Sequence, residues 1–305
     1  MNRKIDYIFD FGANSGQNLE YYLARANKVI AVEANPKLCE DIQNEFKEEI
    51  ISNKLVVANF VLTDSIELSG QEVDFFISIK SSAFSQFQTP KKINDFKKIK
   101  VLSITPSEIV DNFLSSNTNS FYIKIDLEGF DFQVLKDLFK NRIYPDFISV
   151  EAHTIEVFAA LINSEIYKSF TLIDGSKVPK YRWITDLGNA KNFRRHSAGP
   201  FGEDIVGRWF DAKTFYKLLA FEDLGWKDIH ASKLSNDVEE SLNVRFVLKK
   251  SMNLILLSFY LRLTPYKFRK SISRFSYLFK FSKLKNIHKI SRLKYVFRAL
   301  FGDPQ

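Results

Sequence analysis

The 305-residue sequence has one cysteine, no long apolar run and no recognisable secretion signal. The single thiol, Cys39, excludes an internal disulfide and any zinc or iron-sulfur site built from several cysteines. The longest apolar candidate, Leu254 to Leu263, is shorter than the roughly 18 residues that a bilayer requires, and it contains Arg262. Because the first residues pass directly into a strand pattern instead of a signal sequence, we expect a cytoplasmic protein.

Acidic residues are almost missing from the end of the chain. Residues 251–305 hold twelve lysines and arginines but only one acidic residue, Asp303. Their charge of +11 exceeds the +8 of the whole chain, so residues 1–250 sum to −3. The sequence therefore predicts a slightly acidic globular domain over residues 1–250 and a basic tail over residues 251–305.

Apolar runs rich in β-branched and aromatic residues alternate with helical patterns between residues 5 and 152. We predict strands at residues 4–11, 28–34, 54–62, 73–79, 100–104, 121–127 and 146–152. We predict helices at residues 16–26, 36–50, 105–114, 131–139 and 153–164, the third with capping-box spacing from Thr105 to Glu108. Strands that are apolar throughout and alternate with helices indicate a parallel sheet covered on both faces. The predicted fold class is α/β, doubly wound, with residues 243–250 as a late edge strand.

A glycine-containing loop, FDFGANSGQN (residues 9–18), separates the first predicted strand from the first predicted helix. Glycines at such a position allow a tight turn and let backbone N–H groups approach a ligand closely. The spacing is Gly12-x-Asn14-x-Gly16, which lacks the second and third glycines of a dinucleotide-binding fingerprint. Asp10, just before the loop, would repel a pyrophosphate but suits a cationic ligand.

A cofactor without phosphate suits these residues best. S-adenosylmethionine has no phosphate, and its methionine part carries an ammonium group. Glu33 ends the second predicted strand about 20 residues after the loop, where a carboxylate binds both hydroxyls of a ribose. We therefore predict S-adenosylmethionine as the cofactor. The structural alternative is a simple strand-to-helix turn in which Glu33 only caps the next helix.

Four stretches between residues 9 and 153 resemble the FkbM family of S-adenosylmethionine-dependent methyltransferases: FDFGANSGQN, VIAVEANP, FYIKIDLEGFDFQVLKDL and PDFISVEAH. The family's hallmark block is matched by residues 124–129, KIDLEG. The resemblance implies a Rossmann-like class I methyltransferase fold and, usually, O-methylation of a sugar or other small-molecule hydroxyl. The implied cofactor contacts are Asp10, Gly12, Asn14 and Gly16 for the methionine part, Glu33 for the ribose and Asp64 as a candidate for the adenine.

The sequence departs from the family's pattern at two places. Many relatives have a small residue where Phe130 stands, and residues 102–114 lack the threonine-leucine-aspartate pattern common before the hallmark block. These departures concern the acceptor pocket more than the cofactor site.

Titratable side chains follow two neighbouring predicted strands. Asp126 and Glu128 end one strand, and Glu151 and His153 end the next. Groups that meet a ligand in an open α/β sheet lie at the carboxyl ends of the strands, so we predict these four as catalytic residues. A sugar hydroxyl has a very high pKa, which calls for a general base such as His153 or Asp126, or for a divalent cation held by the carboxylates and His153. We favour the base, because no tighter ligand spacing demands a metal.

These charged residues also have structural alternatives. Glu128 would cap the helix that begins near Asp131, and Lys124 would pair with a carboxylate across the sheet.

Residues 153–250 are predicted to hold the acceptor-facing part of the domain and its late strands. The loop HSAGPFGEDI contains three candidate substrate contacts, His196, Glu203 and Asp204. Loops of this kind often carry specificity. The alternative for His196 is a solvated surface histidine.

Apolar residues recur every three or four positions from Leu284, and lysines and arginines stand between them. This spacing predicts an amphipathic, cationic helix, and residues 251–301 suit the anionic surface of a membrane. The alternatives are a helix docked on the protein's own domain and a nucleic-acid-binding segment. Nucleic acid is disfavoured because the only cysteine, Cys39, lies in a predicted helix and no Asn- or Asp-Pro-Pro-aromatic run is present.

Together these features predict an O-methyltransferase that acts on a hydroxyl of a saccharide, glycolipid or polysaccharide precursor. We expect it in the cytoplasm, peripheral on the inner face of the membrane. Two alternatives stay open: a non-catalytic cofactor-binding module that docks to a membrane or a partner, and a methyltransferase for RNA backbone hydroxyls.

Overall fold

The structure, a computed structural model, describes residues 4–115, 117–222, 226–234 and 238–239. The predicted edge strand 243–250 and the predicted basic tail 251–305 lie outside the described residues. The described residues fall into two compact units. The first holds the chain up to Trp209 together with residues 226–234, and the second contains helix α7 (Ala212–Phe221) and strand β14 (Val238–Glu239). Strand β12 (Trp209–Phe210) lies where the chain passes from the first unit to the second.

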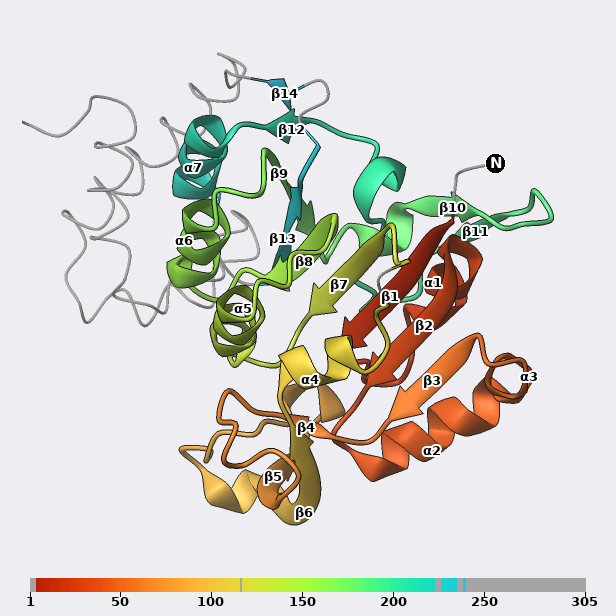
Figure 1. Ribbon diagram of the computed structural model, residues 1–305, viewed down its shortest axis with the longest axis vertical. Helices are drawn as coiled ribbons and strands as arrows, with labels where there is room; N and C mark the ends of the chain where they lie inside the picture. Colours follow the sequence, from red (N-terminus) through yellow and green to blue (C-terminus); the bar gives the residue numbers. More distant parts are fainter. Residues whose placement is uncertain (1–3, 116, 223–225, 235–237, 240–305) are drawn as a thin grey trace, which may run out of the picture. The chain divides into compact units, whose positions relative to one another are not determined.

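The first unit is built on a mostly parallel sheet with the strand order β3-β2-β1-β7-β8-β13-β9 (Figure 1). In this order the strands are Leu55–Ala58, Ala26–Val32, Ile5–Phe11, Phe121–Ile125, Phe147–Glu151, Lys227–Ser232 and Ser169–Asp174. All neighbours from β3 to β8 are parallel, whereas β13 is antiparallel to both β8 and β9. The chain order reverses at β1, which creates the kind of switch point where open α/β sheets bind ligands.

Burial on both faces explains why these segments form central strands. The last four residues of β1 are buried, and so are the last four of β7. Aromatic rings fill part of the core around them: Tyr122 of β7 stacks on Phe201 with the ring centroids 4.1 Å apart. Strands without an exposed face belong in a parallel sheet between two helix layers.

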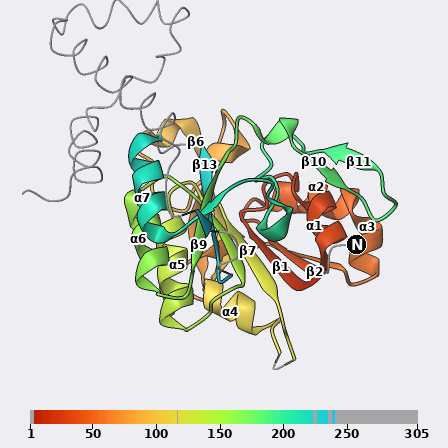
Figure 2. The same cartoon turned by 90° about the horizontal axis from the view of Figure 1, so that it is seen from above.

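Helices cover both faces of this sheet, as Figure 2 shows: α5 and α6 lie on one side, and α1 and α2 on the other. The helices of the first unit, α1 to α6, span Leu19–Arg25, Pro36–Glu45, Lys47–Ile51, Pro106–Asp111, Asp131–Lys140 and Ile155–Asn163. The α/β, doubly wound class predicted from the sequence is therefore confirmed.

Two helix starts follow directly from the sequence. Helix α2 begins at Pro36, and the side chain of Asn35 accepts a hydrogen bond from the N–H of Lys37 at 3.1 Å. Helix α4 has the predicted capping box: Thr105 accepts from the N–H of Glu108, and the Glu108 carboxylate accepts from the N–H of Thr105.

The sequence analysis found the strands between residues 61 and 104 but assigned them to the wrong sheet. The segment predicted as one strand over residues 54–62 splits into β3 and β4 (Val61–Leu62), and Asn59 between them donates to the carbonyls of Glu33 and Ala34. β4, β5 (Glu72–Ser78) and β6 (Phe96–Ile104) form a separate sheet in the order β4-β6-β5. β6 exposes Lys98, Lys100 and Leu102 on one face, and a strand with an exposed face is unsuited to a sheet covered by helices.

A small hairpin of β10 (Arg182–Ile184) and β11 (Ala190–Asn192) also escaped the sequence analysis. Short 3₁₀ turns occupy Ser82–Phe84, Ile93–Asp95, Val178–Lys180 and Gly202–Asp204. Among the residues that the structure describes, no helix is long and apolar enough to cross a membrane.

Candidate active site

A cavity of about 590 Å³ opens at the carboxyl ends of β1, β2, β7 and β8. Each strand contributes a residue at or just beyond its end: Gly12, Glu33, Asp126 and Glu151, respectively. Its volume lies within the roughly 300–1,000 Å³ typical of small-molecule sites. The cavity therefore sits where the switch point of the sheet predicts a ligand.

The loop after β1 has glycines for two separate reasons. Gly12 has a φ of +82°, and a Cβ at this position would lie 2.0 Å from the carbonyl oxygen of Asp126. Gly16, with a φ of +72°, packs against Leu19 and Ile42 instead and does not line the cavity. Only glycine fits at position 12, where the loop passes directly over the backbone of Asp126. This close approach brings Gly12 and Asn14 to the cavity wall.

Glu33 is a buried carboxylate at the cavity wall. Its two oxygens accept hydrogen bonds from the backbone N–H groups of Asn14 and Asn35, both at 2.8 Å. Burial raises the pKa of Glu33 to about 7, and the two backbone hydrogen bonds counteract part of this rise. A carboxylate has about four lone-pair sites, so two remain for hydroxyl groups. Glu33 therefore fits the role of ribose ligand that the sequence predicts.

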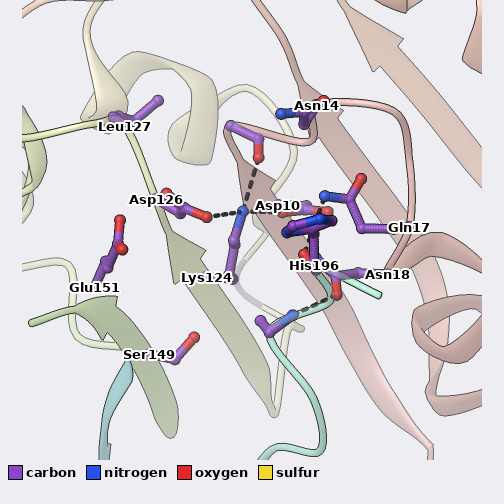
Figure 3. A network of polar contacts seen from close by, with 12 residues as sticks. Asp10, Asn14, Gln17, Asn18, Lys124, Asp126, Leu127, Ser149, Glu151 and His196 are labelled. Atoms are coloured by element: carbon purple, nitrogen blue, oxygen red, sulfur yellow. Dashed lines mark hydrogen bonds and ion pairs between the residues drawn. The ribbon is translucent and has the colours of Figure 1, made fainter. Parts of the chain in front are cut away.

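Asp10 lies behind the cavity wall, at 0% exposure, and pairs with the equally buried Lys124 (Figure 3). The Lys124 ammonium is 3.3 Å from Asp10 and 3.5 Å from Asp126, and it donates to the carbonyl of Gly12 at 2.7 Å. The predicted structural alternative for Lys124, an ion pair across the sheet, is confirmed. Asp10 does not line the cavity, because its carboxylate faces Lys124 and ties β1 to β7.

The four residues predicted as catalytic meet at one side of the cavity. Asp126, Glu128 and Glu151 each place a carboxylate oxygen within 4.8 Å of the others, and Nε2 of His153 lies 2.6 Å from Glu151. Burial raises the pKa of Glu128 to about 8 and also raises that of Glu151, while the hydrogen bond with Glu151 raises the pKa of His153 to about 9. Such a group can exchange a proton near neutral pH, and its three carboxylates are close enough to share one cation.

Helix α5, which follows this cluster, has no side-chain hydrogen bond at its N-cap, and its first residue, Asp131, instead holds the turn before the helix. The Asp131 carboxylate accepts from the N–H groups of Leu127 at 2.9 Å and Gly129 at 3.1 Å. This turn holds Glu128 at a φ of +51°, with its side chain at the cavity. The capping alternative for Glu128 is therefore wrong.

Three further predicted contacts lie away from the cavity lining. Asp64 is exposed, and the apolar residues Phe60 to Leu62 line the wall in its place. Asp204 accepts from the Tyr21 hydroxyl at 2.9 Å and pairs with Arg25 at 2.5 Å, so its carboxylate has a structural role in the fold. Glu203 is exposed beside it. His196, in contrast, does line the cavity.

The sequence analysis missed several residues that line the cavity. Residues 81–87, between β5 and β6, form one wall, and the Ser82 hydroxyl donates to the side-chain oxygen of Asn14 at 3.2 Å. Arg195 and Trp226 come from two later segments. No local pattern marks these residues, because only the tertiary fold brings their segments to the cavity.

A known protein family matches the part of the chain that holds most of the cavity lining. The family model of the methyltransferase FkbM domain matches residues 10–172, more than half of the sequence. No curated protein matches the chain significantly.

Several solved structures are similar at low sequence identity. Methyltransferase FkbM from Methylobacillus flagellatus is 16% identical with a TM-score of 0.32, and the match covers 52% of this chain but only 36% of that protein. The C-terminal domain of precorrin-6Y C5,15-methyltransferase from Rhodobacter capsulatus is 13% identical with a TM-score of 0.35, covering 75% of this chain and 80% of that one. TrmK from M. capricolum, in complex with S-adenosylhomocysteine, is 11% identical with a TM-score of 0.36, covering 97% and 90%. Since all three TM-scores are low, the family assignment rests on the sequence match.

The matched residues 10–172 contain the loop after β1, Glu33, the block from Lys124 to Gly129 and the pair Glu151 and His153. They also contain the parallel strands β2, β3, β7 and β8 and the end of β1. The chain belongs to the FkbM family of S-adenosylmethionine-dependent methyltransferases, and its doubly wound sheet is the Rossmann-like class I methyltransferase fold.

Proposed function

We propose that the protein transfers a methyl group from S-adenosylmethionine to a hydroxyl of a saccharide, glycolipid or polysaccharide precursor. One observation carries the proposal: the ion pair of Glu151 and His153 borders the same cavity as Glu33 and the loop after β1. A proton acceptor and a ribose ligand therefore face one space.

Two kinds of group would contact the cofactor: the carboxylate of one residue and the backbone of the loop after β1. Glu33 would hold the ribose, while Gly12 and Asn14 would bring backbone close to the methionine part. When bound, S-adenosylmethionine supplies an electrophilic methyl group. The protein's contribution to the cofactor is then to position it against the acceptor, which is a large part of catalysis in a displacement reaction.

The acceptor hydroxyl has to lose a proton as its bond to carbon forms. His153 would take this proton at Nδ1, because its Nε2 is buried and faces the Glu151 carboxylate at 2.6 Å, which holds the imidazole ring in place. The nearby carboxylates of Asp131 and Glu128 stabilise the positive charge that His153 gains.

A divalent cation on Asp126, Glu128 and Glu151 is the second way to activate the hydroxyl. The 4.8 Å spread of their oxygens supports this alternative. We favour the base, because His153 already pairs with Glu151. Activity that survives dialysis against a chelator is expected for the base, whereas activity restored only by added Mg²⁺ would establish the cation.

Three measurements test the function. Calorimetry should detect binding of S-adenosylhomocysteine and not of NAD, and S-adenosylhomocysteine should be released only when a glycan acceptor is supplied. The double variant Asp126→Asn/His153→Ala should abolish glycan methylation. Methylation that persists in this variant would refute the assigned chemistry, and activity that disappears on nuclease treatment would favour an RNA acceptor.

For the tail over residues 251–301 we propose contact with the anionic inner face of the membrane, which would make the protein peripheral and cytoplasmic. The proposal is supported by the twelve basic residues against one acidic residue after residue 250. A membrane surface would bring a lipid-linked saccharide close to the enzyme.

A further inference from the structure

A second wall of the cavity consists of Arg195, His196 and Trp226, which we call the aromatic wall. The rings of His196 and Trp226 stack with their centroids 5.3 Å apart and their planes at 29°. The indole of Trp226 is 41% exposed. The part of the indole that His196 and Gly175 leave uncovered can receive a flat, partly apolar ligand surface such as the C–H face of a sugar ring.

The aromatic wall is fixed to the cofactor loop. Gln17 and Asn18 lie beside His196 in Figure 3, and the side chain of Gln17 donates to the carbonyl of His196 at 3.1 Å. Buried Asn18 accepts from the Ser197 hydroxyl at 2.7 Å and from the N–H of Ala198 at 2.9 Å. These bonds join residues about 180 positions apart in the sequence. The wall is therefore held in position beside the start of α1.

Trp226 is positioned separately by the end of β9. Its carbonyl accepts from the N–H of Gly175 at 3.1 Å, and a Cβ at Gly175 would lie 2.5 Å from the indole nitrogen. The indole therefore packs directly on the backbone of a glycine, and a larger residue at position 175 would displace it.

The sheet register places Trp226 close to the proton acceptor. β13 is antiparallel to β8 and pairs Asp228 with Glu151, and the N–H of Ala152 donates to the carbonyl of Lys227 at 2.7 Å. Trp226, which immediately precedes β13, lies at the same sheet edge as Glu151 and His153. A ring stacked on Trp226 would have its hydroxyls near that pair.

The described lining of the cavity has several carboxylates but one permanently charged cation. Arg195 is the one lysine or arginine among the described lining residues, and it forms no ion pair with a described residue. Its neighbour Arg194, outside the lining, pairs with Glu45 at 2.7 Å. The carboxylates of Asp126, Glu128 and Glu151 line the same cavity and would repel an anionic group. An anionic end of an acceptor would therefore lie at Arg195.

We propose that the acceptor is an acidic saccharide whose ring stacks on Trp226 and whose carboxylate pairs with Arg195. A guanidinium matches a planar carboxylate through two parallel hydrogen bonds. A single cation in the same cavity as these three carboxylates suits an acceptor with one negative charge better than a more highly charged phosphate ester. This inference rests on the proposed function and names the class of its acceptor.

The test uses the full chain loaded with S-adenosylhomocysteine and three probes: methyl β-glucuronide, methyl β-glucoside and glucose 6-phosphate. Binding is followed by ligand-observed NMR. We expect the glucuronide to bind about tenfold more tightly than the glucoside, as one charge-assisted contact would give. Arg195→Gln should remove this difference, the control Arg194→Gln should keep it, and Trp226→Ala should weaken both sugars.

Several outcomes would overturn the inference. Equal binding of glucuronide and glucoside would exclude the carboxylate contact, and tighter binding of glucose 6-phosphate would reassign Arg195 to a phosphate. A large loss of S-adenosylhomocysteine affinity in Arg195→Gln would assign the guanidinium to the cofactor's own carboxylate. Failure of the unmodified protein to bind S-adenosylhomocysteine would instead refute the proposed function itself, so the two failures are distinguishable.

Discussion

Glu33 combines burial with the ribose contact that we propose for it, and the two together should make cofactor affinity depend on pH. Burial raises its pKa to about 7, and the charged carboxylate is the form that accepts hydrogen bonds from ribose hydroxyls. We therefore expect the affinity for S-adenosylhomocysteine to fall as the pH drops below about 7, towards tenfold per pH unit. Calorimetry across this range should show the dependence, and Glu33→Gln should bind more weakly at and above pH 7 with a flat profile. A profile of the unmodified protein that is equally flat would remove Glu33 from the ribose site.

His153 should set the pH dependence of the reaction. The hydrogen bond with Glu151 raises its pKa to about 9, so the neutral imidazole that accepts a proton increases up to that pH. We expect the initial rate of methyl transfer to rise from neutral pH to about pH 9 and then to level off.

His153→Ala should lower kcat by roughly 10²- to 10⁴-fold and abolish this rise, with cofactor affinity kept. The control Glu203→Gln changes an exposed carboxylate outside the cavity lining and should leave the profile unchanged. A His153→Ala variant that retains the same pH profile would contradict the role of the base.

Gly12 is constrained by its neighbour more than by its backbone angle. Gly12→Ala would place a methyl group 2.0 Å from the Asp126 carbonyl, whereas Gly70→Ala, at nearly the same φ, would meet nothing within 4 Å. We expect Gly70→Ala to lower the free energy of unfolding by about 1 kcal/mol and Gly12→Ala to lower it by several times as much. Urea denaturation measures both, and equal losses would show that the crossing of the loop over β7 tolerates a side chain.

The element whose stabilisation is easiest to isolate is helix α4. Its capping box joins Thr105 and Glu108 reciprocally. Thr105→Ala removes one half of this box and should lower the free energy of unfolding by about 1 kcal/mol, whereas Thr105→Ser should keep most of it. Urea denaturation of the two variants compares them directly, and equal losses would show that the hydroxyl has no part in capping.

How well each element could be predicted depended on whether its partners are local. β1, β7 and β8 are buried on both faces, so their apolar runs predicted a covered parallel sheet, and the ends of these strands located Asp126 and Glu151. β5 and β6 were predicted as strands but placed in the wrong sheet, because an apolar pattern does not indicate which strand it pairs with.

The candidate site divides in the same way. Gly12 and Glu33 follow strands of recognisable pattern, so sequence motifs located them. Asp204 was predicted to contact the acceptor, but it pairs with Arg25, which is 179 positions away, and no sequence pattern indicates that pair. Trp226 and Arg195 reach the cavity through β13 and the loop tied to Asn18, which only the folded chain brings together.

At the scale of the whole molecule, the uneven charge of the chain predicts membrane binding that salt weakens. The full chain should cosediment with vesicles containing phosphatidylserine and should be released at high ionic strength. The triple variant Lys285→Glu/Lys289→Glu/Lys294→Glu should bind on the order of a hundredfold more weakly, at about 1 kcal/mol for each lysine near the surface.

A matched control changes the same number of charges in the described part of the chain. Lys91, Lys92 and Lys97 are exposed, and their replacement by Glu should have a much smaller effect. If both triple variants lose binding equally, the attraction comes from net charge alone and the tail has no special contact with the membrane.

The rate at which a reagent labels the buried thiol of Cys39 should measure how often the chain beside Glu33 opens. It donates a hydrogen bond to the carbonyl of Glu33 at 3.2 Å, and burial raises its pKa to about 12, so the native thiol is both protonated and shielded. A thiol reagent such as Ellman's can react only when the segment joining β2 to α2 opens. Since the chain has no second cysteine, the labelling rate reports that opening alone. S-adenosylhomocysteine at about 100 times its Kd should slow the labelling about a hundredfold, if the opened form does not bind it.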